Sequence, residues 1–291
     1  MSEYLTTREL AELLRIKERK VYDLAASGKI PCSRAMGKLL FPRRAVDSWL
    51  AGGDTGLGRP LARQASAVFL GSHDPLLEWA LRESRCGLAT FFDGSLDGLD
   101  RFAGGEGIAT GLHLFDPATE EWNVPIVRRR FADRPVVLVE WAWRRRGFVV
   151  ADRDRERVER VEDLRGRRVV PRQPEAGCQG LLEHLLARAG VAEAEIAFTA
   201  PARTESESAL AVFEGKADVA FGLEALAARY RLAFVPVIDE RFDLLVDRRS
   251  WFEAPFQTLL DFCRSALFQS RLAEMQGYAA ASLGRVHFNG T

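Results

Sequence analysis

Two short stretches of the sequence share a pattern that suits the binding of an anion. In the first, an apolar run ends at Gly71-Ser72 and a helical pattern follows; in the second, an apolar run is followed by Gly94-Ser95 and another helical pattern. Free backbone N–H groups at a helix N-terminus can hold an anion. Ser72 and Ser95 are therefore candidate anion-binding residues, although a serine at a helix start is also a common cap with no other role.

The first of these helix starts has two possible caps. Ser72 could cap the helix, or Asp74 could do so with Pro75 at the first helical position. If Asp74 is the cap, its carboxylate competes with any anion for the same N–H groups. The sequence leaves both options open, whereas the helix start at Ser95 has no competing carboxylate before Asp97.

Length and composition indicate the class of protein in which these residues lie. The chain has 291 residues, of which 47% are hydrophobic, so it can bury more than one core. It shows neither a signal peptide nor a run of apolar residues long enough to span a membrane. Widely spaced cysteines predict reduced thiols, without a disulfide framework or a metal site, and we expect a cytoplasmic protein without a cofactor. The cysteines are Cys32, Cys86, Cys178 and Cys263.

Charge is distributed unevenly along a chain whose formal net charge is zero. Residues 1–52 contain ten Lys or Arg against six Asp or Glu, so the remainder carries the compensating negative charge. A Gly-rich segment at 53–66 keeps no apolar period and predicts a linker. We therefore expect a small basic domain at 1–52 that meets a polyanion, and a larger domain at 67–291.

The basic segment has the features of a winged helix-turn-helix. Thr6 and Glu9 form a capping box for a first helix that runs to about Arg15. A second helix should begin near Lys17 and end at Gly28. A hairpin with its turn at Gly37-Lys38 and a helix from Arg43 to Leu50 complete the expected domain.

This segment resembles the winged helix-turn-helix of the excisionase and MerR-like DNA-binding group over nearly its whole length. One departure is Lys17, where that group usually has a Ser or Asn that caps the recognition helix. The resemblance implies that basic and aromatic residues of the second helix face the major groove or its phosphates, with two residues of the wing on the DNA backbone. The alternative is that they are solvated charges on a small helix. The candidate residues are Lys17, Arg19, Lys20, Tyr22, Arg34 and Lys38.

Beyond residue 67, apolar runs alternate with helical patterns, which predicts an α/β domain. From Val68 to about Val246 the chain resembles the molybdate-binding-like proteins of the type II periplasmic binding fold, on stretches such as "GLHLFD" and "GKADVAFG". The resemblance implies two α/β lobes with a ligand between them, the second lobe at roughly 152–240. The crossing strands are expected at "VVLVEWAW" and "FDLLV".

The same resemblance assigns ligand-binding residues in both lobes. Sites of this kind hold a tetrahedral dianion with hydroxyls and backbone N–H groups at helix starts. In lobe two, Cys178 replaces the usual Thr, and Glu205 brings a carboxylate that disfavours a dianion unless it is protonated or turned away. Glu205 could equally be a helix-start acid stabilised by the dipole. The candidates are Ser72, Ser95, Arg172, Cys178, Thr204 and Glu205.

Several other residues each have two possible interpretations. His113 could enter the ligand site or be an interior histidine. The arginine runs 128–130 and 144–146 could contact nucleic acid, but loop or solvated charges are the more common role of such runs. Cys178 could be a reactive thiol or a packed one.

Together these features predict a bacterial one-component regulator in which a winged helix-turn-helix is controlled by a small anionic effector, with molybdate or tungstate first. Binding to two DNA half-sites predicts a homodimer. One alternative is the same scaffold with an organic acid or amine as effector. An enzyme and an excisionase-like architectural factor are less favoured, because no catalytic motif is present and a large ligand domain would be superfluous.

Overall fold

The computed structural model describes residues 4–26, 30–35, 38–43, 45–47 and 67–291. Backbone contacts divide the chain into two compact units, Met1–Gln64 and Ala65–Thr291. Among the described residues, no helix is both long and apolar enough to cross a membrane.

The N-terminal unit contains two short helices and a three-stranded antiparallel sheet in the order β1-β3-β2. Thr6 and Glu9 make the expected capping box at the start of the first helix, and Arg15 ends that helix in the left-handed conformation at φ 53°. The elements are β1 (Tyr4–Thr6), α1 (Thr7–Leu14), α2 (Glu18–Ala26), β2 (Ser33–Ala35) and β3 (Lys38–Pro42).

The helix-turn-helix and the wing hairpin are therefore present, and β1 is an addition that the sequence did not indicate. The second helix begins at Glu18, one residue after Lys17. Residues 43 and 45–47 are helical, as expected. The predicted helix end at Gly28, the wing turn at Gly37, the rest of that last helix and the predicted linker at 53–66 lie outside the described residues.

The second unit is built on one ten-stranded mixed sheet with the main order β11-β10-β12-β9-β13-β6-β4-β5. Parallel strands occupy its two ends, and the antiparallel pairs of β9 and β13 join them. The strands are β4 (Val68–Gly71), β5 (Ala89–Phe92), β6 (Ala109–Leu112), β9 (Val136–Val150), β10 (Arg168–Val170), β11 (Ala197–Phe198), β12 (Val219–Leu223) and β13 (Ala233–Asp247).

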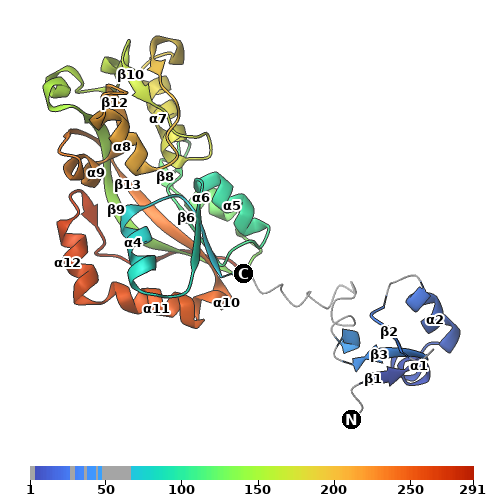
Figure 1. Ribbon diagram of the computed structural model, residues 1–291. Helices are drawn as coiled ribbons and strands as arrows, with labels where there is room; N and C mark the ends of the chain where they lie inside the picture. Colours follow the sequence, from blue (N-terminus) through green and yellow to red (C-terminus); the bar gives the residue numbers. More distant parts are fainter. Residues whose placement is uncertain (1–3, 27–29, 36–37, 44, 48–66) are drawn as a thin grey trace. The chain divides into compact units, whose positions relative to one another are not determined.

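Two long strands run through both halves of this unit and divide it into two α/β lobes (Figure 1). The first part of β9 lies in lobe one beside the end of β13, and its last residues pair with β12 in lobe two. The predicted crossing strands are confirmed, and both are longer than the quoted runs. Register shifts interrupt the β9–β13 pairing between Pro236 and Ile238 and between Phe242 and Asp243.

Helices and a small hairpin complete the lobes. Lobe one contains α4 (Pro75–Glu83), α5 (Ser95–Ala103), the hairpin β7 (Phe115–Asp116) and β8 (Glu121–Trp122), and α6 (Val124–Phe131). Lobe two contains α7 (Gly177–Arg188), α8 (Glu205–Phe213), α9 (Glu224–Arg229) and the 3-10 helices η1 (Asp152–Arg157), η2 (Val161–Leu164) and η3 (Glu193–Glu195).

The chain returns to lobe one at its C-terminal end. Helices α10 (Arg248–Trp251), α11 (Ala254–Cys263) and α12 (Ala266–Glu274) precede the short strands β14 (Tyr278–Ala279) and β15 (Val286–Asn289), which pair with β9. Phe256, Leu259 and Phe268 of these helices are fully buried in the same core as α4 and β9. Lobe one therefore depends on a C-terminal segment that the sequence patterns did not resolve.

Helix α5 lies unusually close to the sheet of lobe one. A Cβ atom on Gly98, within α5, would lie 2.3 Å from the Cα of Gly71 and 2.4 Å from Oγ1 of Thr110. Gly71 itself has φ +102°, a conformation that favours glycine. These two glycines hold the start of α5 against the ends of β4 and β6.

Candidate functional site

Neither of the two predicted serines caps a helix. The cap of α4 is Asp74, whose carboxylate accepts a hydrogen bond from the N–H of Leu77 at 2.7 Å. The cap of α5 is Gly94, and Ser95 is the first residue of that helix. Both serines are buried, and their hydroxyl oxygens lie 2.8 Å apart. The helix starts thus place a pair of hydroxyl groups side by side.

The start of helix α7, which belongs to lobe two, lies beside these two serines. No side chain caps α5 or α7. The N–H of Leu96, in the first turn of α5, donates to the carbonyl of Glu175 from lobe two at 3.0 Å. A Cβ on Gly177, the first residue of α7, would lie 2.4 Å from the carbonyl oxygen of His113 and 3.2 Å from Oγ of Ser95. Two uncapped helix starts, one from each lobe, therefore lie around the buried serines.

Two of the ligand-binding candidates in lobe two have side chains that contact other residues of the same lobe. Thr204 caps α8, and its hydroxyl accepts from the N–H of Glu207 at 3.0 Å. Cys178, the second residue of α7, is buried, and its sulfur lies 3.7 Å from Nη1 of Arg172. Burial, together with the charge of Glu205, raises the pKa of the Cys178 thiol. Cys178 is therefore a protonated, packed thiol, and Thr204 uses its hydroxyl within its own helix.

Glu205 is the first residue of α8, as expected, and it is also a buried member of an ion-pair cluster. Its carboxylate accepts from Nη2 of Arg146 at 2.7 Å and lies 3.2 Å from Nη1 of Arg172. Burial opposes its ionisation, but the two guanidiniums outweigh that effect and lower the pKa of Glu205 to about 2. The remaining donors of Arg172 bind the carbonyls of Ala202 and Arg203. The donors of Arg172 are therefore engaged by protein groups.

The expectation that the arginine run at 144–146 is solvated is wrong for two of its three residues. Arg144 and Arg146 are fully buried, while Arg145 is exposed. Successive residues of a strand point to opposite faces, so β9 directs both buried arginines to one face. Arg146 donates to Glu240 through Nε at 2.7 Å, and Arg144 also donates to Glu240.

From Glu240 the series of ion pairs continues through Arg144 into lobe one. Arg144 donates through Nη1 to Asp74 at 2.9 Å. Asp74 also accepts from the indole N–H of Trp141 at 3.1 Å and from the hydroxyl of Tyr278 at 2.7 Å. Three buried carboxylates thus face three buried guanidiniums in one continuous cluster, whose members are Asp74, Arg144, Glu240, Arg146, Glu205 and Arg172.

His113 lies between this cluster and the serines. Its backbone N–H donates to Oγ of Ser95 at 3.2 Å, and its Nδ1 lies 3.0 Å from a carboxylate oxygen of Glu240. Burial lowers the pKa of His113 more than Glu240 raises it, so the ring is neutral near pH 7. Because the Glu240 carboxylate can only accept, we assign the ring proton to Nδ1, which leaves the lone pair on Nε2.

The grouping of a histidine, a cysteine and a glutamate invites a test for a metal site. One ligand atom from each of His113, Cys178 and Glu205 lies within 4.8 Å of the others. The fit to a cation is poor, because Arg146 and Arg172 already neutralise Glu205 and the pKa of the Cys178 thiol is raised. This donor set therefore does not support a metal centre.

Two polar contacts join the lobes beside the buried cluster. The Gln173 side chain of lobe two donates to the carbonyl of Asp93 in lobe one at 3.4 Å. Nη1 of Arg203 lies 3.5 Å from the Asp93 carboxylate. With the contact between Leu96 and Glu175, they hold the two lobes in contact around the serines.

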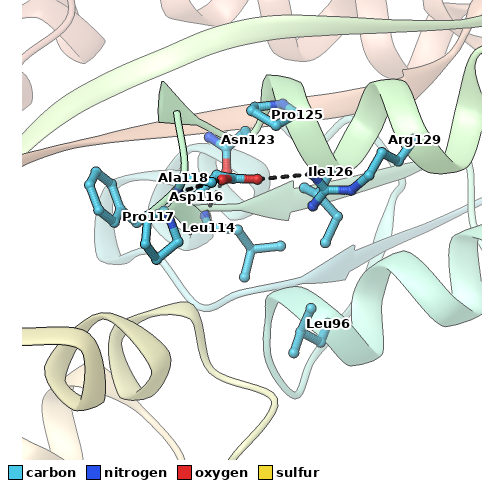
Figure 2. Close-up of a pocket in the computed structure, with 10 residues that line it drawn as sticks. Leu96, Leu114, Asp116, Pro117, Ala118, Asn123, Pro125, Ile126 and Arg129 are labelled. Atoms are coloured by element: carbon cyan, nitrogen blue, oxygen red, sulfur yellow. Dashed lines mark hydrogen bonds and ion pairs between the residues drawn. The ribbon is translucent and has the colours of Figure 1, made fainter. Parts of the chain in front are cut away.

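A separate cavity of about 400 Å³ lies in lobe one, beside the start of α5 (Figure 2). Its wall is mostly apolar, and one ion pair, between Arg129 and Asp116 at 2.9 Å, contributes the charged groups. The lining residues are Leu96, Leu114, Phe115, Asp116, Pro117, Ala118, Asn123, Pro125, Ile126 and Arg129. Buried Asn123 fixes the β7–β8 hairpin above it by accepting from the N–H of Leu114 at 2.6 Å.

In the N-terminal unit, the side chains predicted to contact DNA are on the surface. Lys17, Arg19 and Lys20 are exposed, and Tyr22 is half exposed at 51%. Val21 between them is fully buried, so α2 is held by that residue while its outer face is free of the core. The backbones of the wing residues lie on β2 for Arg34 and on β3 for Lys38. Their side chains are outside the described part of the structure.

Sequence reasoning missed the residues that surround the site from the crossing strands. Arg144, Arg146 and Glu240 were not among the candidates, and His113 was an open alternative. The available signal was the period of two in β9, which places Arg144 and Arg146 on one face. Their acidic partners lie far away in sequence, so no local pattern indicated that the charges were buried.

The fold and this arrangement define a two-lobed binding-protein domain that follows a helix-turn-helix domain. The profile of the PBP superfamily domain matches residues 78–264, and the profile of a helix-turn-helix domain matches residues 4–54. The chain belongs to the PBP superfamily.

Individual proteins are similar to this chain over most of its length. The chain is 23% identical to the uncharacterized protein YvgK of Bacillus subtilis (strain 168), with 97% of this chain and 96% of that protein covered. The regulatory domain of MetR, a LysR family regulator from N. meningitidis, is similar with a TM-score of 0.51 and 10% identity, over 73% of this chain and 97% of that one. A tungstate ABC transporter structure from Geobacter sulfurreducens has a TM-score of 0.50 and 11% identity, over 71% and 97%. At these identities the solved structures support the fold alone.

Proposed function

We propose that this chain is a DNA-binding regulator whose PBP-like domain binds a small tetrahedral oxyanion, with molybdate or tungstate as the first candidates. The N-terminal unit supplies the basic helix α2 for the DNA, and the second unit supplies the effector site. Such a protein acts on DNA in the cytoplasm. Two copies would match the two half-sites of a typical operator. The roles assigned to individual residues belong to this proposal.

One observation carries the choice of an oxyanion. The uncapped starts of α5 and α7 come from different lobes and lie around the buried hydroxyls of Ser72 and Ser95. Helix starts offer partial positive charge and N–H donors without an ion that must be desolvated. The nearby guanidiniums are occupied by carboxylates, so hydroxyl and backbone groups are the natural donors for an added anion. Contacts to both lobes would favour their closed arrangement.

Thermal unfolding with added anions tests this proposal. At about 100 times Kd, molybdate or tungstate should stabilise the protein by ~2.7 kcal/mol, which raises Tm by about 5 to 10 °C for a domain of this size. Sulfate, a smaller dianion, should give a smaller shift. No shift with any tetrahedral oxyanion at millimolar concentration, in a folded protein, would refute the choice of effector.

A pair of serine variants distinguishes a loss of ligand binding from a loss of stability. Ser95→Ala removes a hydroxyl of the proposed site and should reduce the ligand-induced shift in Tm. Ser265→Ala is the matched control, because Ser265 caps α12 by accepting from the N–H of Phe268 at 3.2 Å. The control should lower Tm without ligand and leave the ligand-induced shift unchanged.

A small organic effector is the second candidate, and the cavity of Figure 2 favours it. An apolar wall with one ion pair suits an organic acid or amine better than an inorganic ion. An organic acid would compete with Asp116 for Arg129, and an amine would compete with Arg129 for Asp116. A panel of such compounds in the same thermal assay distinguishes this candidate from the oxyanion.

A further inference from the structure

The buried ion-pair cluster leaves the proposed oxyanion site electrically neutral. Three carboxylates balance three guanidiniums, and the thiol of Cys178 is protonated. A dianion that enters beside this cluster would add two negative charges to a buried region. Uncompensated charge in such a region is costly, so a neutral base close to the anion gains a strong tendency to take up a proton.

His113 is such a base, and its backbone borders the proposed site. Its backbone N–H binds Oγ of Ser95, while its ring stacks on Phe242 with 5.7 Å between the ring centres. The charged and titratable groups that face it come from β13, β9, α7 and α8; they are Glu240, Arg144, Arg146, Cys178 and Glu205.

We propose that His113 is an effector-binding residue that takes up one proton when a dianionic oxyanion binds. This inference rests on the proposed function. Nδ1–H remains on Glu240, and a proton from the solvent adds to Nε2, which then donates to an oxygen of the anion. The resulting imidazolium cancels half of the added charge, and Glu240 fixes the orientation of the ring in both states.

Because of this proton uptake, the site should distinguish anions of similar shape by their charge. The binding of tungstate should strengthen as the pH falls, because the bound form holds one more proton than the free form. Affinity should change by roughly tenfold per pH unit between about pH 7 and pH 9, where the free imidazole is neutral. Perrhenate is a tetrahedral oxyanion with a single negative charge, so its binding should take up fewer protons and depend less on pH.

Titration calorimetry of the full-length protein in two buffers with different ionisation enthalpies counts these protons. We expect about one proton per tungstate and close to none per perrhenate. Tungstate binding with no proton uptake would overturn the role of His113 and leave the proposed function standing. Failure of both anions to bind a folded protein would overturn the proposed function, and this inference with it.

Two histidine variants assign the proton to a residue. His113→Asn retains a donor near the position of Nδ1 and cannot become charged, so it should abolish proton uptake and the pH dependence of tungstate affinity. His73→Asn is the matched control, because His73 follows Ser72 directly but binds Glu78, at 3.1 Å. Proton uptake should persist in the control. A purely structural role for His113 would instead weaken tungstate and perrhenate equally and leave the pH dependence unchanged, and that result would refute the inference.

Discussion

Arg146 and Glu205 form an ion pair that is closed to solvent, with 0% and 1% of their side chains exposed and 2.7 Å between Nη2 and Oε1. Arg146 comes from a strand that joins the lobes, and Glu205 opens helix α8 of lobe two. The pair fixes the start of α8 relative to the crossing strands, so the position of this helix depends on a buried charge.

We expect Glu205→Gln to destabilise the second unit strongly. The substitution keeps the shape of the side chain but leaves Arg146 and Arg172 with one carboxylate fewer. A depression of the Glu205 pKa from 4.5 to about 2 corresponds to a loss on the order of 3 kcal/mol. Urea unfolding at pH 7 measures this loss through tryptophan fluorescence, because five of the six tryptophans lie in residues 65–291.

Glu106→Gln provides the matched control for that experiment. Glu106 pairs with Arg101 at 2.7 Å, but its side chain is 54% exposed. Surface ion pairs contribute little to stability, so the control should unfold at nearly the same urea concentration as the unmodified protein. Equal effects of the two substitutions would contradict the role assigned to Glu205.

The same carboxylate predicts how stability depends on pH. The pKa of Glu205 is lower in the folded protein than in the unfolded chain, so its contribution is complete above the unfolded value, ~4.3. That contribution is lost as the pH falls from about 5 toward the folded value of about 2. Unfolding experiments across this range should therefore show a smaller loss of stability with acid in Glu205→Gln than in the unmodified protein.

A pair of glycine variants on α7 tests the contact between the lobes. Gly177→Ala places a methyl group 2.4 Å from the carbonyl oxygen of His113, so α7 has to move away from lobe one. We expect at least a tenfold loss of tungstate affinity, since this contact brings the two helix starts together.

Gly180→Ala is the control for the glycine experiment. It lies on the same helix, and no atom of the described residues is within 4 Å of the added methyl group. It should retain tungstate affinity and stabilise the protein by up to ~1 kcal/mol through helix propensity. If Gly177→Ala binds tungstate as tightly as Gly180→Ala does, the effector does not require the observed contact between the lobes.

A last prediction concerns the DNA-binding unit. Arg19→Ala combined with Lys20→Ala should weaken operator binding and reduce the log–log dependence on salt by about 0.9 for each lost phosphate contact. The control combines Arg82→Ala with Arg264→Ala, two exposed arginines of the second unit, and removes the same charge. Gel-shift or anisotropy titrations at several salt concentrations measure both. An equal loss in the two double variants would argue against α2 as the DNA-contacting helix.

Local patterns predicted many of the helices and strands, whereas the two-lobed arrangement was implied by the family resemblance. The capping box at Thr6 and Glu9 located α1, and apolar runs located the main strands of the second unit, including β9 and β13. The C-terminal helices were not predicted, because their apolar positions complete the core of lobe one and carry no motif of their own. The contact partners of the candidate ligand residues, such as Arg146 for Glu205, were not predicted.

Burial of charge was the main feature that could not be predicted. Arg144 and Arg146 occur in a run of three arginines, which by itself indicates a solvated segment. Their partner Glu240 becomes adjacent only when β13 pairs with β9. Asp74, which caps α4, likewise has contacts with Trp141 and Tyr278 that no local pattern indicated. These outcomes depend on tertiary pairing and not on local sequence.

The two register shifts of the β9–β13 ribbon enclose the stretch Ile238–Phe242, which includes Glu240 and pairs with residues 142–146. Any rotation of one lobe against the other has to bend this stretch, so the pivot contains three members of the buried cluster, Arg144, Arg146 and Glu240. Mobile salt ions do not reach these charges, and the stiffness of the pivot should therefore be independent of ionic strength. The exposed residues of α2 are fully open to screening. For the proposed regulator, a change in salt would then alter the affinity for DNA without altering the response of the lobes to an effector.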